Sequence, residues 1–327
     1  MHMRQLGTNG PQVSALGLGC MGMTPIYATP DPDEALATVS AAVDAGITMI
    51  DTADMYAGGK NEELVGRAIK GLRDRIVLAS KFGNMRLPDG SRKVNGRPEY
   101  VFEACEKSLS RLGVDFIDLY YLHRMDPSVP IEDTVGAMAQ LIEQGKVGAI
   151  GLSEAGASTI RRAQATHPLA AVQTEYSLAS RDVEAEILPT CRELGIGFVA
   201  YAPLSRGLLS GHITSLDGLG ENDRRRDMPR FQGDNLGSNL AMVDAVGDIA
   251  SSKGVSTAAI SIAWVLARGD DVIPIPGCSR RETLKDSLTA LDIQLSNDDL
   301  AAIETALDAD RIIGTRYPEK QMQRLEL

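Results

Sequence analysis

Eight short apolar runs recur along the chain, each followed by a longer amphipathic segment. The runs are rich in β-branched residues and alternate little, which is typical of strands buried on both faces of a parallel sheet. They cover residues 15–18, 48–50, 76–80, 116–122, 147–152, 171–174, 197–200 and 272–275. Helical patterns follow at 33–45, 62–70, 99–112, 131–144, 158–165, 183–194, 257–268 and 281–288. Eight strand–helix units in succession predict an α/β fold, a closed (β/α)8 TIM barrel, rather than an open doubly wound sheet.

Several pieces fall outside the eightfold pattern. Residues 3–6 and 12–13 flank an Asn9-Gly10 turn and predict a β-hairpin at the barrel floor. Extra helices are expected at 239–253 and 298–308, and Asp33 is expected to cap the first helix of the barrel. The Gly-rich segment 211–238 is interpreted as a cofactor or substrate loop, and 309–327 as a weakly patterned C-terminal tail. We therefore expect residues 1–327 to form one barrel domain.

The charge balance narrows the possible partners. The chain has 44 acidic and 33 basic residues, a formal net charge of -11. This argues against a nucleic-acid binder and against docking on an anionic membrane. The N-terminus lacks a signal-peptide pattern, and the four cysteines are scattered, as in proteins of a reducing compartment. We expect a soluble cytoplasmic protein with a small-molecule partner and no metal, because the four histidines lack ligand spacing. The sequence does not reveal an oligomeric state.

Polar side chains follow three neighbouring strands where an active site is expected. Asp51 and Tyr56 follow the second predicted strand, Lys81 the third and His123 the fourth. The active sites of such barrels lie at the carboxyl ends of the strands. A buried lysine needs an anion, and Asp51 is the obvious partner. An ammonium beside Tyr56 would lower the tyrosine pKa from about 10 towards neutrality and make it a general acid for a carbonyl oxygen, which a neutral imidazole could orient.

Each of these four residues also has a structural explanation when taken alone. Lys81 could be a charge at the rim, and Tyr56 could simply fill a Gly-rich turn. Four such groups on three adjacent strand ends are much less easily explained by coincidence.

The motifs around these residues are specific. They are DTADMY at 51–56, NEELVG at 61–66, SKFG at 80–83, SLSRLGVDFIDLYYLH at 108–123, VGAIGLS at 147–153, AYAPLSRGLLSG at 200–211 and IPIPG at 273–277. With them the chain resembles, over nearly its whole length, the aldo-keto reductases, NAD(P)H-dependent carbonyl reductases built on a (β/α)8 barrel. It looks closest to their bacterial, yeast and plant branch of small-aldehyde and auxin-induced-type enzymes.

The resemblance implies a catalytic tetrad of Asp51, Tyr56, Lys81 and His123. Tyr56 would be the general acid in reduction, Lys81 would depress its pKa, Asp51 would hold Lys81, and His123 would orient the carbonyl. Hydride would pass directly from NADPH to the carbonyl carbon. The physiological substrate stays unknown.

Cofactor contacts carry over by motif. The resemblance implies that Ser153 and Gln173 hold the nicotinamide carboxamide and that Tyr201 stacks under its ring. The pyrophosphate would run along Pro203, Leu204, Ser205, Arg206, Gly207, Leu208 and Ser210. The adenosine end would meet Gly277, Ser279, Arg280, Thr283, Asp286 and Ser287.

Two positions near the cofactor need separate comment. A helix start bearing Arg280 and Arg281 is by itself an anion site and favours the 2′-phosphate of NADPH, unless both arginines are merely solvated. Glu154 stands where many relatives have Asn. A carboxylate cannot donate to a carboxamide oxygen, so that contact is either lost or made by Gln173.

Substrate contacts are expected from Met21, Tyr27, Met55, Phe82 and Arg124. The methionines suggest an adaptable apolar pocket, and Arg124 could anchor an acidic group or simply face solvent. Two other functions stay open. One is a non-enzymatic barrel that binds NADPH and regulates a partner. The other is a metal-dependent hydrolase, or an aldolase that uses Lys81 as a Schiff base.

Overall fold

The computed structural model, which describes residues 1–87 and 91–326, contains a parallel barrel. In the described part of the chain, one sheet has eight strands in the spatial order β3, β4, β5, β8, β9, β10, β11, β12. These strands are Leu18–Gly19, Met49–Asp51, Val77–Phe82, Ile117–Leu122, Val147–Ser153, Ala171–Glu175, Gly197–Tyr201 and Val272–Ile275. A parallel bridge from Gly19 to Gly277, and a bond from the Gly17 N–H to the Pro274 carbonyl (3.0 Å), join the first strand to the last. The predicted (β/α)8 barrel is confirmed.

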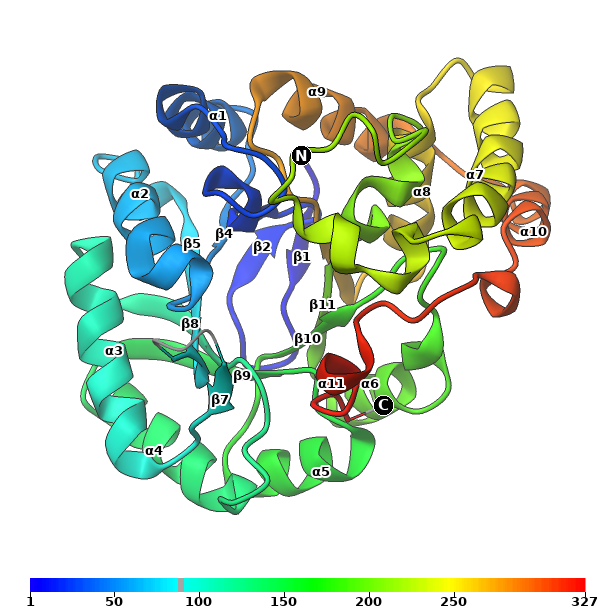
Figure 1. The fold of residues 1–327 in the computed structure, drawn as a ribbon. Coiled ribbons are helices and arrows are strands. Elements are labelled where there is room, and N and C mark those ends of the chain that lie inside the picture. Colours follow the sequence, from blue (N-terminus) through cyan, green and yellow to red (C-terminus); the bar gives the residue numbers. More distant parts are fainter. Residues whose placement is uncertain (88–90, 327) are drawn as a thin grey trace.

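Helices surround the barrel as the amphipathic pattern predicted (Figure 1). The outer ring consists of α1 Pro32–Asp44, α2 Lys60–Ala68, α3 Pro98–Leu112, α4 Ile131–Glu143, α5 Ala157–Thr166, α6 Ile187–Leu194, α8 Thr257–Leu266 and α9 Arg281–Thr289. The extra helices are α7 Asp234–Ser252, which starts five residues before the predicted one, and α10 Asn297–Ala306. The predicted cap of α1 was wrong. Pro32 takes the first helical position, where its fixed φ suits the helix, so Asp31 is the cap and accepts the Asp33 N–H at 3.0 Å.

The N-terminal hairpin closes the barrel floor, as predicted. Strands β1 (Met3–Gln5) and β2 (Gln12–Ser14) pair in antiparallel register, and Leu6 and Val13 are fully buried in the inner apolar cluster of the barrel. The Thr8 N–H donates to the Gly195 carbonyl at 2.7 Å. Gly7 has φ +64°, and a Cβ there would lie 2.6 Å from the Ala170 carbonyl oxygen. Only glycine fits this close approach to the sheet.

Two features were not predicted. A second hairpin, β6 (Asn84–Arg86) and β7 (Arg92–Val94), follows β5. The C-terminal tail returns from α10 to the barrel mouth and ends in the short helix α11 (Glu319–Met322) (Figure 1). Leu327, the last residue of the predicted tail, lies outside the described residues. Among the described helices, none alone is long and apolar enough to cross a membrane; α7 and α8 reach that length and composition only as a pair bent by 89°.

Candidate active site

A buried ion pair lies at the carboxyl ends of β4 and β5. Asp51 ends β4, Lys81 lies in β5, and both are at most 2% exposed. The Lys81 ammonium pairs with Asp51 Oδ1 and donates to the Thr52 carbonyl at 2.8 Å. Asp51 Oδ2 accepts a hydrogen bond from Gln173 Nε2 at 2.8 Å. Burial lowers the pKa of Lys81, and Asp51 opposes that effect only in part. The predicted Asp–Lys partnership is therefore present and is extended by Gln173.

Tyr56 and His123 contact each other next to this pair. The Tyr56 ring meets the His123 ring edge-on, with centroids 5.9 Å apart, and Lys81 Nζ lies 5.3 Å from the Tyr56 centroid. Tyr56 opens the turn Tyr56–Gly59, and the His123 N–H donates to the Phe82 carbonyl at 2.8 Å. The fold thus brings together the four side chains that the strand-end argument selected.

The pKa of Tyr56 differs from the prediction. Burial and the negative charge of Asp51 raise it well above its ordinary value, and Arg124 only partly opposes them. Lys81 does not produce the predicted lowering, because its ammonium donates to Asp51 and Thr52 and its charge is balanced by Asp51. Tyr56 is consequently protonated at neutral pH, as a proton donor must be.

The Glu154 side chain is engaged with other residues of the protein. Its carboxylate accepts the Tyr201 hydroxyl at 2.6 Å, the Glu175 N–H at 3.1 Å, and both terminal nitrogens of Arg316 at 3.3 and 3.1 Å. Glu154 is fully buried and Arg316 is 3% exposed. Four donors occupy the carboxylate, which explains how an acidic residue is tolerated at this buried position.

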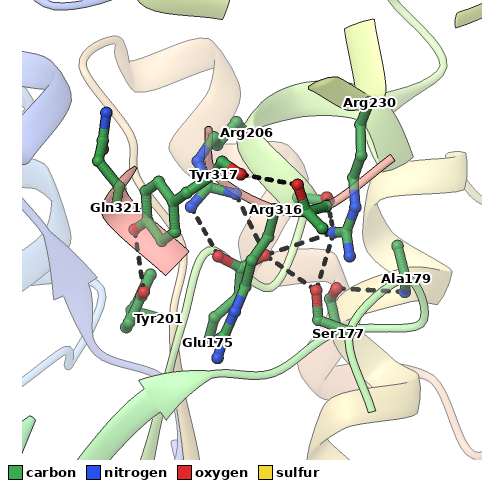
Figure 2. Close-up of polar contacts among 12 residues, drawn as sticks. Glu175, Ser177, Ala179, Tyr201, Arg206, Arg230, Arg316, Tyr317 and Gln321 are labelled. Atoms are coloured by element: carbon green, nitrogen blue, oxygen red, sulfur yellow. Dashed lines mark hydrogen bonds and ion pairs between the residues drawn. The ribbon is translucent and has the colours of Figure 1, made fainter. Parts of the chain in front are cut away.

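A second buried charge cluster surrounds Glu175 (Figure 2). Glu175 accepts two bonds from Arg206, at 3.1 and 2.6 Å, and Arg230 lies 3.5 Å away. The Arg206 guanidinium also covers the ring of Tyr317, 4.4 Å from its centroid, and the Tyr317 hydroxyl lies 3.0 Å from that of Tyr201. Burial alone would raise the pKa of Glu175, but the surrounding arginines lower it to about 2.

A sequence model described as the Aldo/keto reductase family matches residues 15–308. The chain belongs to the aldo/keto reductase family. It is therefore an oxidoreductase that interconverts carbonyl groups and alcohols with NADP(H), as the motifs implied.

Solved structures agree with this assignment. The glycerol dehydrogenase AKR11B4 from Gluconobacter oxydans is 29% identical with a TM-score of 0.85, over 93% of this chain and 94% of that one. The holo form of AKR11C1 from Bacillus halodurans is 29% identical with a TM-score of 0.78, over 94% and 97%. An aldo/keto reductase from Klebsiella pneumoniae, in complex with NADP and acetate, is 29% identical with a TM-score of 0.72, over the full length of both chains.

The start of α9 is built to hold an anion. Glu34 from α1 accepts the Arg281 N–H at 2.9 Å and pairs with the Arg281 guanidinium, and Arg281 lowers the pKa of Glu34 to about 2. This carboxylate shows that the helix start of this aldo/keto reductase accepts negative charge, so the residues fit a phosphate. Arg280 is exposed, and its ion-pair contact to Glu282 is long at 3.8 Å. Of the two predicted phosphate ligands, Arg280 is available, whereas Glu34 holds Arg281.

The other predicted adenosine contacts are engaged within the protein. The hydroxyl of Thr283 donates to the Arg280 carbonyl at 2.9 Å, and that of the buried Ser287 to the Thr283 carbonyl at 2.9 Å. Asp286 accepts the Ser256 hydroxyl at 2.7 Å. Gly277 is exposed and Ser279 is partly buried. The region lies where expected, but its side chains offer few free donors beyond Arg280.

The predicted pyrophosphate loop follows β11 closely. Arg206 is held by Glu175, the buried Ser205 accepts Arg230 Nη1 at 3.2 Å, and Ser210 donates to the Gly207 carbonyl at 2.6 Å. The other predicted side chains of this loop are apolar and turned into the protein. Pro203 and Leu208 are buried, and Leu204 packs against the hydrophobic core. Leu208 can therefore offer a ligand only its backbone.

The predicted substrate residues divide into two groups. Met21, Tyr27, Met55 and Arg124 are partly buried. Phe82, by contrast, is fully buried and stacks on Tyr120, with centroids 4.9 Å apart. Side chains alternate along a strand, so Phe82 faces the helices because its neighbour Lys81 faces the barrel interior. The structure does not place Phe82 with the other four.

Sequence reasoning missed Arg316 and Tyr317, which reach the site from the C-terminal tail. That tail carries no periodic pattern, so no local signal marked these residues. No group of three or more potential metal ligands occurs within the described ranges 1–87 and 91–326.

Proposed function

We propose that this aldo/keto reductase uses Tyr56 to protonate the oxygen of an aldehyde or ketone, with Asp51, Lys81 and His123 as the rest of the catalytic tetrad. The convergence of these four side chains at one edge of the barrel carries the proposal. Bound NADPH would supply hydride to the carbonyl carbon. His123, whose ring meets the Tyr56 ring, would orient the carbonyl towards the Tyr56 hydroxyl.

The positions of the charged residues suggest how the rest of the tetrad acts. Asp51 holds Lys81 on one oxygen and Gln173 on the other. As a proton leaves Tyr56, the nearby ammonium of Lys81 would stabilise the phenolate. Tyr56 would then be a donor that stays protonated until the carbonyl oxygen takes its proton.

The cofactor would lie across the carboxyl ends of β9 to β12. Ser153 and Gln173 would hold the carboxamide, Tyr201 would face the nicotinamide ring, the loop from Pro203 to Ser210 would run along the pyrophosphate, and the start of α9 with Arg280 would take the 2′-phosphate. The anion-accepting geometry at Arg281 and the NADP-bound relative from Klebsiella pneumoniae support this placement. Substrate would enter between Met21, Tyr27, Met55 and Arg124. We also propose a cytoplasmic location, supported by four free, buried cysteines.

The test is NADPH oxidation at 340 nm with aldehydes, ketones and dicarbonyls, repeated with NADH. Tyr56→Phe should lower kcat at least about 100-fold, because general acid catalysis contributes roughly 10²–10⁴. NADPH binding should be unchanged. Tyr100→Phe, on α3, is the matched control and should keep full activity.

Other outcomes would select the alternatives. Unchanged turnover in Tyr56→Phe would remove Tyr56 from the mechanism. Tight NADPH binding without turnover of any carbonyl would favour the regulatory barrel. A borohydride-trapped adduct on Lys81 would favour a Schiff-base aldolase; none is expected, because Lys81 is fully buried and paired with Asp51.

A further inference from the structure

Arg124 is an incompletely paired cation beside the tetrad. It directly follows His123, and its Nη1 donates to the His123 carbonyl at 2.6 Å and to Ser153 Oγ at 3.2 Å. Within the described chain, Nε and Nη2 have no hydrogen-bond partner, yet neither is among the enclosed unpaired atoms. These N–H groups therefore remain open to a ligand or to water.

Every buried carboxylate near Arg124 is already occupied. Glu154 accepts bonds from Arg316, Tyr201 and a backbone N–H, as described above. Asp51 is held by Lys81 and Gln173.

The cluster behind the mouth contributes no free carboxylate either. Glu175 is held by Arg206, Arg230 and the Ser180 hydroxyl, the last at 2.9 Å. Arg124 itself forms no ion pair within residues 1–87 and 91–326. Its charge is consequently not neutralised by direct contact with a carboxylate of the protein.

Arg124 thus keeps a cation without a directly contacting carboxylate at the barrel mouth, although the protein as a whole carries a net charge of -11. Burial raises the pKa of the Tyr317 hydroxyl, but Arg206 and Arg124 outweigh it and leave the pKa below its ordinary value. A partly buried guanidinium with free N–H groups pairs well with a carboxylate, because charge-assisted bonds to a planar fork are strong and directional.

We propose that Arg124 determines specificity by binding a carboxylate or similar anionic group of the substrate, so that the preferred substrates are small aldehydes or ketones that carry such a group close to the carbonyl. This inference rests on the proposed function, because it places the substrate beside Tyr56 and His123. Glu154 pairs with Arg316 and not with Arg124, which leaves the Arg124 guanidinium available to the anionic group of the substrate.

The experiment compares two aldehydes that differ in the anionic group alone. 4-Oxobutanoate and butanal have the same number of carbons, and each is assayed by NADPH oxidation with wild type, Arg124→Gln and Arg124→Lys. Arg311→Gln, an exposed arginine of the tail, is the matched control. Wild type should prefer 4-oxobutanoate by at least about tenfold in kcat/KM, since a hydrogen bond to a charged group contributes roughly 10- to 100-fold.

Arg124→Gln should lose this preference through a higher KM for 4-oxobutanoate, so that kcat/KM falls at least about tenfold more for 4-oxobutanoate than for butanal. Arg124→Lys should keep part of the preference, because it retains the charge and loses the fork. The KM for NADPH should not change in either variant. Thermal unfolding of each variant checks that the fold is intact.

Three results would overturn the inference. Equal kcat/KM of wild type for the two aldehydes would show that no anion is recognised, while NADPH oxidation with both would leave the proposed function standing. A raised KM for NADPH in Arg124→Gln, with the anion preference retained, would assign Arg124 to the cofactor. No oxidation with either aldehyde or with the wider carbonyl panel would refute the proposed function and this inference together.

Discussion

The buried carboxylate of Glu175 offers a quantitative test of the charge network behind the active site. It is fully buried, and the side chains of its partners Arg206 and Arg230 are 5% and 9% exposed. The perturbation is Glu175→Gln, which keeps the shape of the side chain and removes its charge. Two buried guanidinium groups would then lose their counter-ion.

The size of the effect can be worked out in two ways. The arginines lower the pKa of Glu175 from 4.5 to about 2, and at about 1.4 kcal/mol per pKa unit this corresponds to roughly 3 kcal/mol. Removing one partner of a buried ion pair typically destabilises a protein by about 3–5 kcal/mol. Both arguments predict a loss of about 3 kcal/mol in the free energy of unfolding at pH 7.

The sign of the pH dependence follows from the same shift. A carboxyl whose pKa is depressed on folding contributes stability above its unfolded pKa and loses it as the pH falls towards the folded pKa. The difference between wild type and Glu175→Gln should therefore be full above pH 4.5 and shrink towards pH 2. Urea unfolding can be followed by fluorescence of Trp264, the single tryptophan, which is fully buried and 5.5 Å from the Tyr176 ring.

The matched control is Glu193→Gln. Glu193 forms an equally short two-point pair with Arg161, at 2.7 and 2.6 Å, but the two side chains are 60% and 46% exposed. Exposed ion pairs contribute about 0–1 kcal/mol. If Glu175→Gln destabilises the protein no more than Glu193→Gln does, the buried network around Glu175 contributes no more stability than an exposed ion pair.

Glu34→Gln should lower the Kd for NADPH about two- to tenfold, because the variant frees Arg281 and the start of α9 for a phosphate. Fluorescence titrations measure this Kd, and the Kd for NADH should stay unchanged. An unchanged Kd for NADPH would show that Glu34 does not compete with the cofactor phosphate. Burial raises the pKa of Asp54 to about 8, so the wild type should lose up to about 1.4 kcal/mol of stability per pH unit as the pH rises from 5 to 8. Asp54→Asn should flatten this dependence in thermal unfolding. An equal slope in both proteins would contradict the prediction. Gly66→Ala places a Cβ 2.4 Å from a backbone oxygen at the end of α3 and should destabilise the protein by about 1–3 kcal/mol in urea unfolding. A Cβ at Gly136 on α4 meets nothing within 4 Å, so Gly136→Ala should stabilise the protein by about 0.5–1 kcal/mol. Similar effects of the two variants would refute the role of this close contact.

The barrel, and the grouping of four polar side chains at its mouth, could be predicted because both follow local rules. Apolar runs marked each strand of the barrel, and the rule that barrel sites lie at strand ends selected Asp51, Lys81 and His123. The hairpin of β6 and β7 escaped prediction because its strands are short and polar. The orientation of Phe82 was predictable from strand alternation once Lys81 was assigned to the interior.

Contacts between distant segments were not predictable in the same way. The capture of Arg281 by Glu34 joins residues 247 positions apart, and no local pattern distinguishes Glu34 from other acidic residues on the surface of a helix. The pKa of Tyr56 depended on where the charge of Lys81 was balanced. The sequence identified the pair but could not say that Asp51 and Thr52 would hold the ammonium so completely.

Glu154 shows how a departure from a family pattern can still be informative. A carboxylate that follows a buried strand needs cations or several donors, because a buried unpaired charge is strongly destabilising. Glu154 therefore needs a compensating partner, but with 33 lysines and arginines in the chain the sequence could not identify Arg316, 162 residues away in an unpatterned tail. Once that partner is known, Glu154 has a role in anchoring the tail and orienting Tyr201. The same pairing leaves Arg124 without a carboxylate partner, so the choice of Arg316 by Glu154 determines which guanidinium at the barrel mouth remains unpaired.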